Sequence, residues 1–188
     1  MIKRTKAKAK LARIIPNALT LINLCLGLFA MLLVFDPDKS RWFIACLLVL
    51  IAAVMDRFDG KAARLFGTTS DLGRELDSLC DLVSFGVAPI VITWKLCFSA
   101  FGIPGYLLCL AFPMAGAYRL ARFNVTTFQN IYMGMPITIA GSFLTLLNLY
   151  NWYSLNGSGL AVLNTAITIA VVHALSFLMV CTVKIRKM

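Results

Sequence analysis

Long apolar runs separated by short polar connections make up most of this chain. Each run is close to the ~20 residues that a helix needs to cross the hydrocarbon core of a bilayer. The connections are rich in turn-forming residues, as at Asp36–Asp38 and Asn156–Gly159. The pattern therefore predicts an all-α membrane protein. Its six transmembrane helices are expected at residues 14–35, 42–58, 72–98, 104–123, 135–153 and 160–183, the second continuing as a polar helix to Leu65.

The composition and the charge distribution agree with this fold class. Of the 188 residues 60% are hydrophobic, and the mean hydropathy is +0.84. Fifteen of the 18 basic residues fall at the termini or around the connections after the second and fourth helices. Because Lys and Arg collect on the cytoplasmic side, both termini are expected there, in a multi-pass protein of the cell (inner) membrane. The net charge of +10 therefore indicates membrane orientation and anionic lipid, and we expect no nucleic-acid partner.

Residues 1–13 form a basic juxtamembrane segment ahead of the first span. Six of them are basic: Lys3, Arg4, Lys6, Lys8, Lys10 and Arg13. Their loose alternation with apolar residues is consistent with an interfacial helix on the membrane surface, and equally with a disordered basic tail. Both alternatives stay open.

Six of the eight acidic residues fall between Asp56 and Asp81. On helices, Asp56 and Asp59 share one face, and so do Asp77 and Asp81. Four carboxylates in or near lipid cannot all stay charged unless cations neutralise them. Because the available ligands are oxygens, the stretch favours a hard cation, Mg²⁺ or Mn²⁺, of the kind that usually also binds phosphate.

Two other classes could place acids in a membrane protein. A solvated loop between two helices carries mixed charges, but without helical register or placed glycines. A divalent-cation transporter would not require Gly60, Ala63, Arg64 and Gly73 at fixed spacing, and its acids would lie deeper and on more helices. The pattern therefore favours a cation site that serves chemistry.

The residues from Asp56 to Asp81 fit the pattern D-x2-D-G-x2-A-R-x8-G-x3-D-x3-D at every fixed position. This pattern resembles the signature of the CDP-alcohol phosphotransferase family. The resemblance implies transfer of a phosphatidyl or similar group from a CDP-linked donor to an alcohol, with release of CMP. It also implies a six-helix membrane bundle, a homodimer, and one transmembrane catalytic domain over residues 14–188.

Three further stretches are similar to the phosphatidylserine-forming branch of that family. They are Ile15-Pro16-Asn17 with Thr20, the run from Asp77 to Pro89, and the run from Arg119 to Asn124. The resemblance implies CDP-diacylglycerol and L-serine as substrates. Where the branch has F-x-G-L-P-x-P, this chain reads Tyr132-Met133-Gly134-Met135-Pro136-Ile137-Thr138, without the second proline. Other acceptors within the family, glycerol phosphate or inositol phosphate, remain the alternative.

The resemblance also assigns roles to residues. It implies a site for two divalent cations, Mg²⁺ or Mn²⁺, held by Asp56, Asp59, Asp77 and Asp81, with Asp81 as the general base. The expected donor contacts are Asn17, Thr20, Gly60, Ala63, Arg64, Ser70 and Gly73. From the residues alone, Asn17 and Thr20 could equally cap or join helices.

Arg119 and Arg122 lie on one face at the cytoplasmic end of the fourth helix, followed by Asn124. The two arginines could simply extend their charged ends toward the membrane surface. With Asn124 they could instead bind the carboxylate of the acceptor serine.

Overall fold

The computed structural model describes residues 2–65, 71–125, 134–155 and 161–181, and only the backbone at 2–16, 59–65, 155 and 161. Five uninterrupted helices lie in these ranges: α1 (Ile2–Val34), α2 (Lys39–Leu65), α5 (Ile103–Val125), α6 (Ile137–Leu155) and α7 (Ala161–Val180). Between α2 and α5 lies one composite helix made of five consecutive segments. It begins with α3 (Asp71–Asp81), the π-helix η1 (Leu82–Val87) and α4 (Ala88–Thr93). It ends with the π-helix η2 (Trp94–Phe98) and the 3₁₀ turn η3 (Ser99–Phe101). The described chain thus folds into six long helical stretches, as the sequence predicts.

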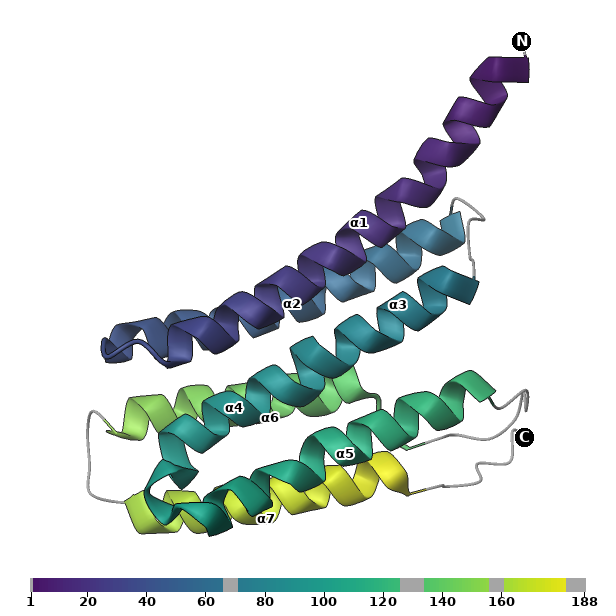
Figure 1. Cartoon of the computed structure of the whole chain (residues 1–188). Coiled ribbons are helices and arrows are strands. Elements are labelled where there is room, and N and C mark those ends of the chain that lie inside the picture. Colours follow the sequence, from purple (N-terminus) through teal and green to yellow (C-terminus); the bar gives the residue numbers. More distant parts are fainter. Residues whose placement is uncertain (1, 66–70, 126–133, 156–160, 182–188) are drawn as a thin grey trace.

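The helices run back and forth along one axis (Figure 1). The ends of α2, α5 and α7 lie at the same end of the bundle as the start of α3, and the first turns of α1 project beyond that end. The basic segment is therefore helical as part of α1. Its place at a membrane surface remains a prediction.

Three of the described helical stretches have the length and apolar composition of a membrane span: Asn17–Val34, Asp71–Phe101 and Val162–Val180. Of the other three stretches, α2 has charges at both ends, and α6 contains Asn148 and Asn151. Large apolar side chains such as Leu32, Leu107 and Phe177 are exposed on the outside of the bundle. An apolar exterior of this kind faces lipid, so the chain is a helical membrane protein.

A tight turn joins α1 to α2. The backbone N–H of Ser40 donates to Oδ1 of Asp38 at 2.9 Å, so Asp38 caps the start of α2. The guanidinium of Arg41 binds the carboxylate of Asp36 across the same turn. These local bonds explain why α2 begins at Lys39, three residues before the apolar run.

The composite helix packs closely against its neighbours on two sides. A Cβ at Gly27 of α1 would lie 2.8 Å from Cα of Ser84, and one at Gly141 of α6 would lie 2.4 Å from the carbonyl oxygen of Phe85. Glycine allows this approach of backbones because it has no Cβ. The sequence pattern did not predict the π-helical turns, and the first of them begins directly after Asp81.

Candidate functional site

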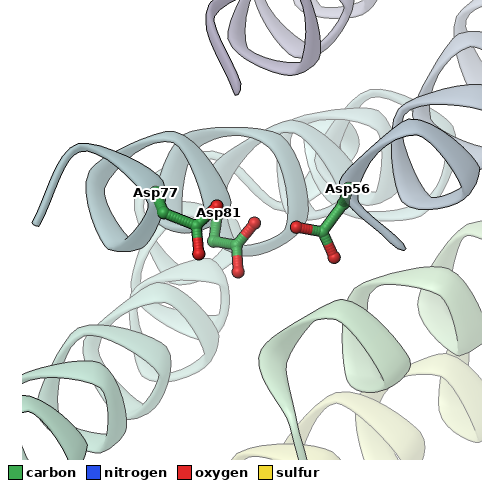
Figure 2. Close-up of side chains that lie close together, drawn as sticks. All are labelled: Asp56, Asp77 and Asp81. Carbon is green, nitrogen blue, oxygen red and sulfur yellow. The ribbon is translucent and has the colours of Figure 1, made fainter. Parts of the chain in front are cut away.

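Three carboxylates from two helices meet at one end of the bundle. Asp56 comes from α2, and Asp77 and Asp81 come from α3. One carboxylate oxygen of each lies within 4.8 Å of the others. Figure 2 shows the three side chains converging, with Asp56 facing the α3 pair across the space between the helices. The structure therefore brings together residues that are 25 positions apart in sequence.

Local structure explains how two of the three carboxylates come together. Asp77 and Asp81 are four residues apart on α3, so they lie on the same face one turn apart. Asp81 is the more enclosed of the two, with 9% of its surface exposed, because it stands where α3 enters the bundle as η1. Asp56 is half-buried on α2. Its approach to α3 comes from the packing of the two helices.

The donor set fits a hard divalent cation. Every ligand atom in the group is a carboxylate oxygen, and the three are close enough to share an ion. Bringing three like charges together in a partly buried place is unfavourable unless a cation neutralises them. The described residues that could hold a cation are therefore Asp56, Asp77 and Asp81.

Two further acidic residues of the stretch have other partners. Asp71 accepts a bond from Nη2 of Arg74 at 2.7 Å on the exposed first turn of α3. Glu75 accepts a bond from Nδ2 of Asn124 at 3.1 Å. The acidic stretch thus contains a cluster of three and two surface residues with partners of their own.

Asp59 lies on α2, three residues beyond Asp56, and only its backbone is described. The same holds for Gly60, Ala63 and Arg64, and Ser70 lies outside the described residues. Gly73 lies on the first turn of α3, one turn before Asp77. The roles expected for these residues remain predictions.

A polar face of α1 lies beside the composite helix. Thr20 is buried, Asn17 is half-buried, and Asn23 is fully buried. The hydroxyl of Ser84 donates to the backbone oxygen of Asn23 at 3.0 Å. Within the described chain neither amide atom of Asn23 has a hydrogen-bond partner. A buried amide normally finds partners, so this face can offer a donor and an acceptor to a bound polar group.

The expected acceptor residues of α5 separate in the structure. Asn124 contacts α3, because its Nδ2 donates to Oγ of Ser78 at 3.1 Å, next to Asp77. Arg122 turns toward α7, where its Nη1 donates to the backbone oxygen of Val180 at 3.1 Å. Its guanidinium also lies 5.5 Å from the ring centre of Tyr118. Arg119 is half-buried, one turn earlier on α5.

Sequence reasoning missed a contact from α6. The hydroxyl of Thr138 donates to Oδ2 of Asp56 at 3.3 Å. The only signal in the sequence was that Thr138 occupies the position of the missing second proline. Ser78, which contacts Asn124, was also missed, and its place between the aspartates of α3 was its only signal.

A groove between α2 and α6 begins beside this contact. It encloses about 400 Å³. Arg57 and Thr138 lie at the end near Asp56, and the rest is lined by Leu50, Ala53, Val54, Ile139, Ser142, Phe143 and Leu146. The lining residues recur every three or four positions on each helix, so the groove follows the helix axes away from the carboxylate cluster. Its shape and apolar walls suit an extended hydrocarbon chain.

Several proteins of known activity are similar to this chain. A Helicobacter pylori (strain J99) protein is 38% identical over 134 residues, which cover 70% of this chain and 55% of that protein. A Bacillus subtilis protein is 37% identical, with 71% of this chain and 75% of that protein covered. A Methanocaldococcus jannaschii protein is 36% identical, with 76% and 64% covered. Each is named CDP-diacylglycerol–serine O-phosphatidyltransferase. The match spans about half the length of the Helicobacter pylori protein.

The family model for CDP-alcohol phosphatidyltransferases matches residues 13–183, which include all the candidate site residues and every described helix except the first eleven residues of α1. The carboxylates that the structure gathers are fixed positions of the motif from Asp56 to Asp81. With most of its length matched, the chain belongs to the CDP-alcohol phosphatidyltransferase family.

Proposed function

We propose that this protein transfers the phosphatidyl group of CDP-diacylglycerol to the hydroxyl of L-serine, giving phosphatidylserine and CMP. The observation that carries the proposal is the convergence of Asp56, Asp77 and Asp81 at the polar end of an apolar bundle. The activity named for three relatives supports CDP-diacylglycerol and serine as substrates.

The aspartates are proposed to hold two divalent cations, Mg²⁺ or Mn²⁺, with Asp59 completing the set. When bound, such ions supply Lewis-acid stabilisation of the negative charge on the diphosphate. The chain's own contribution is to fix the carboxylates in one place and to keep that place at the membrane surface. There the head group of a lipid substrate can reach the cluster while its tails remain in the bilayer.

The groove between α2 and α6 supports a lipid donor. Its apolar walls suit an acyl chain, and Arg57 lies at the end closest to Asp56, where a phosphate would need a positive partner. The nucleotide half of the donor is assigned to Arg64 and the small residues Gly60, Ala63 and Gly73, with Ser70. On α1 the proposed contacts of the nucleotide are Asn17 and Thr20, together with the buried amide of Asn23.

The chemical step needs one proton acceptor. The serine Oγ attacks the phosphorus of the phosphatidyl group, the bond to the CMP oxygen breaks, and the serine proton passes to a base. Asp81 is proposed as that base, because it is the most enclosed of the three carboxylates and lies one turn beyond Asp77. Arg119 and Arg122 are proposed to bind the serine carboxylate, with Asn124 held nearby by Ser78.

The protein is proposed to be a homodimer of the cell (inner) membrane, with both termini and the site on the cytoplasmic side. The asymmetry of basic residues supports this orientation. A membrane-impermeant thiol reagent added to intact cells should label a cysteine introduced near Asn156 and should miss one near Thr69. The opposite pattern would overturn the orientation, and crosslinking in membranes tests the dimer.

An acceptor screen tests the reaction. The purified protein receives CDP-diacylglycerol, Mg²⁺ or Mn²⁺ and one alcohol at a time, and release of CMP is measured. Serine should support release, whereas glycerol phosphate and inositol phosphate should not. If only a phosphorylated acceptor supports release, the proposed reaction class stands, and serine is not the acceptor. No release with any alcohol would contradict the proposal.

A further inference from the structure

We propose that Thr138 is a positioning residue for the carboxylate cluster: from α6 its hydroxyl orients Asp56 so that this carboxylate faces Asp77 and Asp81. The inference rests on the proposed metal site and adds α6 to the helices that form this site. Neither the family motif nor the comparisons give Thr138 a role.

The hydrogen bond from Thr138 restrains how Asp56 is oriented. Oδ2 of Asp56 accepts from the Thr138 hydroxyl at 3.3 Å. In Figure 2 one oxygen of Asp56 points toward the α3 pair, and the other points away from it. A carboxylate turns about its last side-chain bond over a broad range, so a donor on one oxygen restricts where the other one points. At 3.3 Å the bond is long for a hydroxyl donor, so its contribution is to orientation more than to stability.

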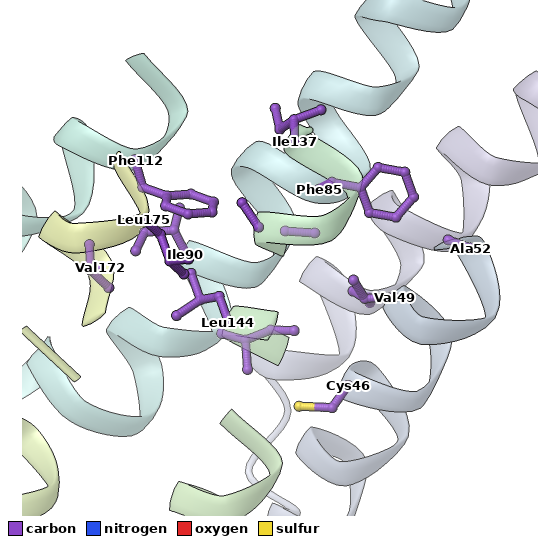
Figure 3. Packing of buried hydrophobic residues seen from close by; sticks show 14 of the residues in the cluster. Cys46, Val49, Ala52, Phe85, Ile90, Phe112, Ile137, Leu144, Val172 and Leu175 are labelled. Atoms are coloured by element: carbon purple, nitrogen blue, oxygen red, sulfur yellow. The ribbon is translucent and has the colours of Figure 1, made fainter. Parts of the chain in front are cut away.

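The start of α6 is a rigid support for this donor. Ile137, next to Thr138, is 1% exposed, and a Cβ on Gly116 of α5 would lie 2.5 Å from its Cδ1. One turn later, Gly141 lies against the backbone of Phe85. Figure 3 shows Ile137 and Phe85 inside the apolar core. Because the residues on both sides of Thr138 are tightly packed, this turn of α6 places its hydroxyl beside Asp56.

The cluster therefore depends on three helices. α2 provides Asp56, α3 provides Asp77 and Asp81, and α6 provides the orienting hydrogen bond. Groups that hydrogen-bond to a ligating carboxylate typically change metal affinity by about 10- to 100-fold when they are removed. Thr138 is expected to have this effect on divalent-cation binding.

The test measures binding of Mn²⁺ alone to the purified full chain, by the loss of the electron paramagnetic resonance signal of free Mn²⁺. Thr138→Val keeps the shape and removes the donor, and it should raise the Kd for Mn²⁺ about 10- to 100-fold. Thr138→Ser keeps the donor and should bind as the unchanged protein does. Thr138→Pro is compatible with the first turn of a helix but cannot donate, so it should behave like the valine variant.

Thr145→Val is the matched control. Thr145 is buried two turns further along α6, and its hydroxyl donates within the helix to the backbone oxygen of Gly141 at 2.7 Å. The same substitution there removes a hydroxyl from the same helix without touching the cluster. Its Mn²⁺ affinity should be unchanged, and the melting temperatures of both valine variants are compared to exclude a loss of folding.

The outcomes separate this inference from the proposed function. If Asp56→Asn weakens Mn²⁺ binding but Thr138→Val binds like Thr145→Val, the role of Thr138 is wrong and the metal site stands. If Asp56→Asn also leaves Mn²⁺ binding unchanged, the metal site is wrong, and the role of Thr138 falls with it. If Thr138→Val weakens Mn²⁺ binding and Thr138→Ser does not, the inference is supported.

Discussion

Two groups of polar side chains in the described bundle differ in charge: the carboxylate cluster, and a neutral group formed by Thr93, Asn148, Asn151 and Thr168, called here the amide network. The network is fully buried between the composite helix, α6 and α7. Thr93 donates to Oδ1 of Asn148 at 2.9 Å, and Nδ2 of Asn148 donates to the backbone oxygen of Pro89 at 2.9 Å. Nδ2 of Asn151 donates to Thr168 at 2.9 Å.

The two groups differ in how their polarity is compensated. The amide network is uncharged and uses donors and acceptors of the chain itself, so it joins helices in the way polar residues do in membrane bundles. The cluster brings together three acids at the bundle end, where a bound cation would offset their mutual repulsion. Of these two groups, the charged one therefore indicates a site and the neutral one indicates helix packing. The predictions test that difference.

The largest effect is expected from Asp81→Asn. The change keeps the shape of the side chain and removes the proposed base, so turnover should fall by about 10² to 10⁴. Binding of CDP-diacylglycerol should fall much less, since Asp56 and Asp77 remain. The melting temperature should not drop, because one of three crowded charges is removed. CMP release, donor binding and thermal unfolding are measured on the same preparation, and near-normal turnover would place the base elsewhere.

Arg122 tests a site role against a packing role, since it lies near the end of α5 and its guanidinium reaches the end of α7. If it belongs to the site, Arg122→Lys should raise the KM for serine by roughly tenfold, the cost of one weakened charged hydrogen bond. The KM for CDP-diacylglycerol should stay the same. An unchanged KM for serine with a lower melting temperature would assign Arg122 to the packing of α7 instead.

Asn148→Leu tests the amide network. It removes the bonds to Thr93 and Pro89, and the free energy of unfolding should fall by about 1 kcal/mol, the usual scale for such bonds in membrane bundles. Mn²⁺ affinity should be unaffected, because the network does not share a residue with the cluster. Stability is read from the melting temperature in one detergent. A loss of Mn²⁺ binding without a loss of stability would mean that the two regions are coupled.

The smallest effect is expected at Asp38, at the opposite end of α2 from the cluster. The hydrogen bond from the backbone N–H of Ser40 holds the pKa of this exposed carboxyl below its ordinary value. Because the folded-state pKa is the lower one, the stabilisation is present above the ordinary pKa and is lost as the pH falls through the folded-state value. As the pH is lowered, the stability of the Asp38→Asn variant should fall slightly less than that of the unchanged chain. Melting curves recorded from about pH 5 downward measure this difference. Identical curves would show that the cap does not contribute.

The sequence by itself determined the parts of this protein that depend on local periodicity. Long apolar runs predicted the six helical stretches, because a helix in lipid satisfies its own backbone and needs only length and composition. The four-residue spacing of Asp77 and Asp81 placed them on one face for the same local reason. The family followed from eight fixed residues in one short stretch, which the match over residues 13–183 confirmed.

Only the tertiary structure decided which residues of other helices lie against the face of α3 that carries Asp77 and Asp81. Asp56 reaches α3 from α2, Thr138 reaches Asp56 across 82 positions, and Asn124 reaches Ser78 across 46. These meetings depend on how far each helix is rotated and shifted against its neighbours. Close glycine contacts such as Gly141 against Phe85, and a π-helical turn beginning just after Asp81, set that rotation and shift. Hydropathy carries no information about either, since the same apolar pattern is compatible with many registers between helices in lipid.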